Sequence, residues 1–153
     1  MSRDSVMENI KVAIGFKPQT ITQTVTGTAI DTSGFHSLAC VVHYGTNGDT
    51  LDTSNYITCK LQECATSGGT YTDIPDAQIV DAASIGSETN AFGVDNDAAD
   101  DDAVWVIGAR DFMRYVRVVA TVTGTLTYGT PASSVFLKGW ASKADVGNLR
   151  LGS

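Results

Sequence analysis

The chain has 153 residues and a mass of 16.1 kDa, a size that fits one domain able to bury a core without disulfides or metal. Only 18% of its residues are charged, and nineteen threonines and fifteen glycines supply much of the polarity, which favours strands and turns over helices. Seventeen acidic and ten basic residues give a net charge of −7, which argues against nucleic acid as a partner.

The sequence also argues against membrane and secreted proteins. No apolar run reaches eighteen residues, and the first thirty positions lack the pattern of a secretory signal. Cys40, Cys59 and Cys64 are an odd number, which favours free thiols over a disulfide framework. We therefore expect a soluble protein made in the cytoplasm, with no membrane partner.

The charge is unevenly distributed along the chain. Residues 88–102 carry six acidic and no basic residues, whereas residues 103–153 carry two acidic and six basic residues. An electrostatic partner would therefore meet two different kinds of surface.

In chain order, residues 1–17 are predicted to form an N-terminal arm, because Gly15 and Pro18 interrupt any regular element there. The apolar residues of this arm are either a contact surface for a neighbour or part of the protein's own core. Those that we expect to contact a neighbour are Ile10, Val12, Ile14 and Phe16.

Residues 18–138 are predicted to form one β domain, followed by a C-terminal tail over residues 139–153. Alternation of apolar and polar residues between turn signals predicts the strands. Their expected ranges are 20–30, 37–44, 56–63, 70–74, 77–80, 91–94, 104–107, 112–122, 126–128 and 134–137. The apolar continuity of residues 37–44 indicates a strand that is covered on both faces.

Many short strands separated by glycine-containing turns, with no convincing helix, predict an all-β fold. We expect a β-sandwich with jelly-roll or immunoglobulin-like connections, and we favour the jelly roll. The arm and the tail would extend from its two ends.

The acidic stretch is the candidate metal site. Its carboxylates suit calcium, but their spacing is not that of an EF-hand loop, and a solvated acidic loop is the competing interpretation. The candidate calcium ligands are Asp95, Asp97, Asp100, Asp101 and Asp102. Because neither a zinc-ligand spacing nor a nucleophile motif is present, we expect no cofactor and no catalysis.

Three arginines form the most basic feature of the last third of the chain. Arg114 and Arg117 are three residues apart on a predicted strand, so their side chains point to opposite faces. Either these arginines are solvated at a strand edge, or one of Arg110, Arg114 and Arg117 anchors an acidic protein surface through a bidentate pair.

Two segments resemble a known family. Residues 60–74 (KLQECATSGGTYTDI) and 107–118 (IGARDFMRYVRV) are similar to a strand-turn-strand and a following strand in small β proteins of tailed phages and prophages. The resemblance covers residues 18–137 and includes head cement, or capsid decoration, proteins. Cys64 and the acidic insert at residues 95–102 depart from the family pattern.

The resemblance implies a structural virion protein on the capsid exterior, which binds the major capsid protein and associates with itself as a homodimer or homotrimer. Apolar residues of the arms would make these contacts, and at the C-terminal end they are Trp140, Leu149 and Leu151. One alternative is a carbohydrate- or receptor-binding module of a tail or fibre, which would use calcium and the exposed aromatic residues Tyr44, Tyr56, Tyr71 and Trp105. Another is a different head–tail structural protein.

Overall fold

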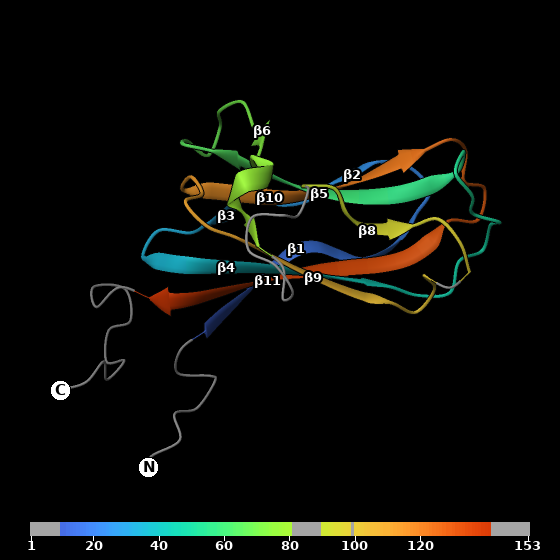
Figure 1. Ribbon diagram of the computed structural model, residues 1–153, viewed down its shortest axis with the longest axis horizontal. Helices are drawn as coiled ribbons and strands as arrows, with labels where there is room; N and C mark the ends of the chain where they lie inside the picture. The colour runs from blue at the N-terminus through green and yellow to red at the C-terminus, as the bar shows by residue number, and fades with distance from the viewer. Residues whose placement is uncertain (1–9, 81–89, 99, 142–153) are drawn as a thin grey trace, which may run out of the picture.

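A computed structural model describes residues 10–80, 90–98 and 100–141. Two antiparallel β-sheets pack face to face, and Figure 1 shows them as an upper and a lower layer. The expected all-β sandwich is therefore confirmed.

The lower layer, which we name sheet A, has five strands in the order β1-β11-β4-β9-β7. Their bounds are Ile10–Ile21 for β1, Phe35–Tyr44 for β4, Ile79–Val80 for β7, Val104–Ala109 for β9 and Thr130–Ala141 for β11. The last strand, β11, lies between β1 and β4, so it pairs with two strands from the first third of the chain.

The upper layer, sheet B, has the order β2-β10-β5-β6, with β3 beside β10 and β8 beside β5. Its strands are β2 (Val25–Thr26), β3 (Ile30–Asp31), β5 (Tyr56–Cys64), β6 (Thr72–Asp73), β8 (Phe92–Asp95) and β10 (Tyr115–Thr123). A short 3₁₀ turn, η1 (Asp76–Gln78), leads into β7.

The connections follow the jelly-roll order. When β2 and β3 are counted as one interrupted strand, the chain crosses from β1 to β2–β3, back to β4 and again to β5. The later strands then pair antiparallel with these early ones. β9 adds beside β4, β10 lies between β2 and β5, and β11 lies between β1 and β4. This nesting of late strands between early ones is typical of two Greek keys joined in a jelly roll.

The core lies between the two sheets, and strand alternation supplies it. Every second residue of β5 and β10 points inward and is buried, for example Leu61 and Val118, and Phe136 of β11 meets them from sheet A. All three cysteines are buried with free thiols. The Tyr44 hydroxyl donates to the Gly93 carbonyl at 2.7 Å, so this buried polar group is satisfied.

The predicted N-terminal arm is wrong for the residues that the structure describes. Residues 10–17 belong to β1, which pairs with β11. Phe16 is 3% exposed, and its backbone N–H donates to the Ser134 hydroxyl at 2.8 Å. The predicted tail is likewise wrong at its start, since β11 continues to Ala141. Both segments are strands because each supplies the other's backbone hydrogen bonds.

The strand predicted over residues 20–30 is broken into the end of β1, β2 and β3. At the break, the Gly27 N–H donates to the Val118 carbonyl of sheet B, while the Thr28 N–H donates to the Gly15 carbonyl of sheet A. A Cβ atom on Gly27 would lie 2.7 Å from both carbonyl oxygens. The segment between β2 and β3 thus bonds to both sheets at once, and a side chain at position 27 would collide with two backbone carbonyls.

Residues 126–128, predicted as a strand, form a loop in which Leu126 is buried. The Asp49 carboxylate accepts hydrogen bonds from the backbone N–H groups of Thr127, Tyr128 and Gly129. A side chain therefore takes the place of a neighbouring strand, which alternation alone does not reveal.

Phe16 and Ile14 provide a direct test of the position of β1. We expect Phe16→Ala to lower the free energy of unfolding by about 3–5 kcal/mol, because it empties a core site. Ile14→Ala should cost less than about 1 kcal/mol in dilute protein, because that side chain is 55% exposed. Urea unfolding measures both, and equal losses would show that β1 is misplaced.

Candidate protein-interaction surface

The side of sheet A that faces away from the core is lined by aliphatic side chains. Residues paired directly across an antiparallel sheet point to the same face, and the register places Ile14, Val135, Val41 and Val106 in one row across four strands. A second row contains Val12, Leu137, Ala39, Gly108 and Val80. We name this surface the apolar outer face, defined by Val12, Ile14, Ala39, Val41, Val80, Val104, Val106, Val135 and Leu137.

These side chains are accessible to solvent. Val12 and Ile14 are each 55% exposed, Val104 is 59% exposed and Val106 is 57% exposed. Together with Met113 and Tyr128, they make up the exposed large hydrophobic residues of the described chain. Four of the six therefore gather on one side of one sheet, which makes this patch the candidate interaction surface.

The charge of this surface sets it apart from the rest of the protein. The five strands of sheet A contain three lysines and no acidic residue, although the whole chain has seventeen acidic residues. Lys138 points toward sheet B, where it donates to the Asp31 carbonyl at 2.9 Å. The strands that carry the apolar outer face thus contribute none of the protein's negative charge, and Lys138 is turned away from that face.

The outer side of sheet B is polar by contrast. Lys60 pairs with Asp73 at 2.9 Å, and the Arg117 guanidinium donates to the Gln62 side-chain oxygen while it stacks over the Tyr71 ring. Such partly exposed pairs contribute little stability but keep a surface wetted. The two outer faces of the sandwich are therefore chemically unlike.

A shallow depression interrupts the apolar outer face at Gly108. Its volume is about 390 Å³, and Val80, Val106 and Arg110 are among the residues around it. Arg110 is exposed at the end of β9, so it places one positive charge at the margin of the apolar rows. Of the three arginines predicted to make contacts, Arg110 is therefore the one that lies beside aliphatic residues of this face.

The structure brings some of the predicted contact residues together and separates others. Val12 and Ile14 lie on the apolar outer face, and Ile10 lies at its end, opposite Gly139. Phe16 is a core residue, so its predicted contact role is wrong. The side chain of Trp140 and the predicted tail residues Leu149 and Leu151 lie outside the described residues.

Arg114 makes its bidentate pair within the chain. Its Nε and an Nη donate to the two carboxylate oxygens of Asp31 at 3.0 and 2.8 Å. The hydrogen bond from Arg114 lowers the pKa of Asp31 to about 2. Arg117 is also engaged on sheet B, so both arginines already have a partner within the chain.

Sequence reasoning missed the central residues of the surface. Val41, Val104, Val106, Val135 and Leu137 were expected only as strand residues. The signal that could have found them is the apolar continuity of residues 37–44, which indicated burial on both faces. In the described chain one face of β4 packs on the core and the other joins the apolar outer face.

The aspartates of the candidate calcium loop point in different directions. Asp101 accepts from the Asn47 backbone N–H and Asp102 from the Thr46 hydroxyl. Asp95 is buried at the end of β8 and accepts from the Thr130 hydroxyl at 3.1 Å. Among residues 10–80, 90–98 and 100–141, no three acidic, histidine or cysteine side chains converge on one point as metal ligands would. The loop is instead tied to the 45–49 turn and to β11.

The environment of Asp95 is unfavourable to its charge. Burial raises the pKa of Asp95 to about 6, the Thr130 hydrogen bond opposes this shift, and the negative charges of Asp101, Asp100 and Asp97 add to it. One carboxylate oxygen has no hydrogen-bond partner among the described residues. Folding therefore favours the protonated form of this side chain.

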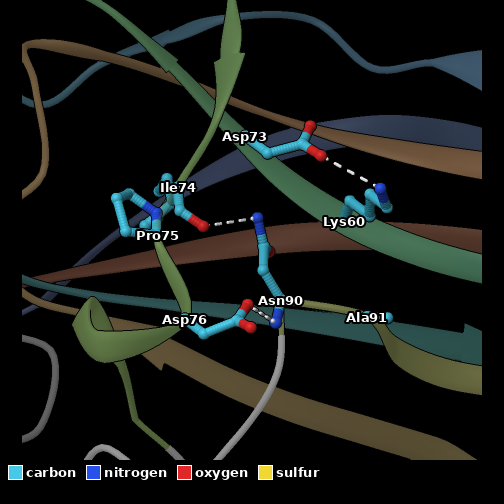
Figure 2. A pocket seen from close by; sticks show the side chains of 7 residues that line it. All are labelled: Lys60, Asp73, Ile74, Pro75, Asp76, Asn90 and Ala91. Atoms are coloured by element: carbon cyan, nitrogen blue, oxygen red, sulfur yellow. Dashed lines mark hydrogen bonds and ion pairs between the residues drawn. The ribbon is translucent and has the colours of Figure 1, made fainter.

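A second depression, of about 460 Å³, lies beside Asn90 (Figure 2). The Asn90 amide donates to the Leu61 and Ile74 carbonyls and accepts from the Leu61 N–H, and its backbone N–H donates to Asp76. Lys60 and Asp73 at the rim are paired with each other. Because these groups satisfy one another, the arrangement is a structural link between β5 and the segment before η1.

The aromatic residues expected of a carbohydrate-binding module are largely covered. Tyr44 is fully buried, Trp105 packs against the core and Tyr71 lies under the Arg117 guanidinium. Tyr56 is half-buried in β5. Tyr44 therefore has no exposed ring, and the other three rings are partly covered.

Comparison with known proteins adds no family. A scan against protein-family models and a search of curated proteins each find no match for this chain. Within the described ranges, none of the helical segments has the length and apolarity to cross a membrane. The apolar outer face is thus the feature on which a functional argument must depend.

Asp95 gives a prediction on pH dependence. Because its folded pKa of about 6 lies above the ordinary 3.8, stability falls as pH rises between these values and stays lower above them. We expect Asp95→Asn to raise the unfolding midpoint by about 2–4 °C at pH 7.5, with no gain at pH 3.5.

The matched control is Asp102→Asn, which removes the same charge from an exposed position of the same loop and keeps a residue that tolerates its φ of 54°. Thermal unfolding followed by circular dichroism measures both variants. A gain for Asp95→Asn that is equal at both pH values would contradict the assignment of a raised pKa.

Proposed function

We propose that the protein is a structural virion component that binds the outer surface of a phage capsid and stabilises it. The observation that carries the proposal is the apolar outer face, which is continuous, exposed and free of acidic residues. Sheets that are aliphatic on both sides are stable when both sides are covered. In a protein that works inside an assembly, a neighbouring subunit covers the second side of the sheet.

The resemblance of residues 60–74 and 107–118 to cement proteins supplies the kind of assembly. Those segments cover the second half of β5, the turn after it, β6, the end of β9 and the start of β10, so the similarity lies in the scaffold of the sandwich. Under this proposal the major capsid protein is one partner, and other copies of the chain are a second. Repeated attachment to a symmetric shell strengthens each weak contact through avidity.

A different head–tail structural protein is the second candidate, because an apolar sheet face would also suit a tail or connector ring. The carbohydrate-binding alternative has less support, since Tyr44, Trp105 and Tyr71 are covered. The three candidates differ in what they bind, and one experiment separates them.

The purified chain should be added to three targets: expanded capsids that lack it, isolated tails and an array of free glycans. We expect it to sediment with the capsids and to raise the temperature at which they release DNA by about 5 °C or more, because a ligand stabilises the state it binds. Binding to tails alone would favour the second candidate. No binding to capsids and no gain in heat resistance would contradict the proposal.

A further inference from the structure

We infer that, before the protein binds a capsid, the apolar outer face of one copy docks on the same face of a second copy, and that the capsid takes the place of that copy on binding. This inference rests on the proposed function only in using the same surface. It assigns the partner from three properties of that surface: its size, its charge and its shape.

The size of the face fits an interface between two proteins. With strands about 4.8 Å apart and a rise of about 3.3 Å per residue, the outer side of β1, β11, β4 and β9 measures roughly 600 Å², and the aliphatic rows occupy about half of it. Two such faces would bury about 1,200 Å², which reaches the range of specific and stable interfaces. The full breadth of β1, β11, β4 and β9 is needed to reach that area, and these are the strands that carry the aliphatic rows.

The charge of the protein favours this face over any other for self-association. Each copy carries a net charge of −7, so contact through an acidic surface would bring like charges together. The strands of sheet A have no acidic residue. Docking through their outer side therefore buries aliphatic groups and no acidic residue of sheet A.

The shape of the face is suited to a twofold contact, in which the same patch occurs on both sides. Aliphatic sheet faces pack about 10 Å apart with interdigitating side chains, as they do inside a sandwich. The depression beside Gly108 is a recess in a face that otherwise projects Val12 and Ile14. One face thus offers both the projections and the recess that a second copy requires.

Sedimentation equilibrium of the full chain, without capsids, tests the inference. We expect a species of twice the 16.1 kDa mass at micromolar concentrations. Raising NaCl from about 0.05 to about 0.5 M should strengthen the association, because salt screens the repulsion between two negative copies without weakening an apolar contact.

Val106→Glu places a charge within the aliphatic rows of the interface, and we expect the dimer to dissociate at least about 100-fold more readily. Thr121→Glu is the matched control, since it adds the same charge to the outer side of sheet B, opposite Thr58. That control should leave the dimer within about threefold of the original. Circular dichroism checks that both variants keep the fold.

A monomeric wild type would overturn the inference and would mean that the capsid or the chain's own terminal segments cover the face. Equal effects of the two substitutions, or a dimer that salt dissociates, would also overturn it. Capsid binding by a monomer would leave the proposed function standing. A dimer that binds no capsid would refute the proposed function alone.

Discussion

Strand alternation places aliphatic side chains on both faces of sheet A, and the described part of one chain covers only one of them. On the inner face, Leu38, Val42 and Phe136 are buried in the core; on the outer face, Val12 and Val106 remain more than half exposed. A face of this kind is costly in water. The same alternation that builds the core therefore also leaves an aliphatic surface exposed in the described part of the chain.

The outer side of sheet B, by contrast, is covered by polar side chains of the chain itself. Threonines and charged side chains occupy its outer side, where Lys60 pairs with Asp73 and Arg117 stacks on Tyr71. The low fraction of charged residues in the sequence is thus spread unequally between the two outer faces. We interpret the difference as the division between a surface that meets solvent and a surface that meets protein.

Alternation within a strand made β4, β5 and β10 predictable, because their core residues recur at every second position. The position of β1 was not predictable, since Gly15 and Pro18 break its pattern and its pairing depends on Ser134, 118 positions away. The Arg114–Asp31 pair likewise joins residues 83 positions apart. Among the contact residues, Val12 and Ile14 could be found from their apolar character, but which face they share with Val41 and Val106 depends on register.

Hydroxyl-radical footprinting of the capsid-bound protein tests most directly whether the apolar outer face is a protein contact. Ile14, Val104 and Val106 should be oxidised readily in dilute protein and should lose most of that reactivity on the capsid. Tyr128, which is 72% exposed and lies outside the apolar outer face, should react equally in both states. Unchanged oxidation of the three aliphatic residues in the bound protein would contradict the account.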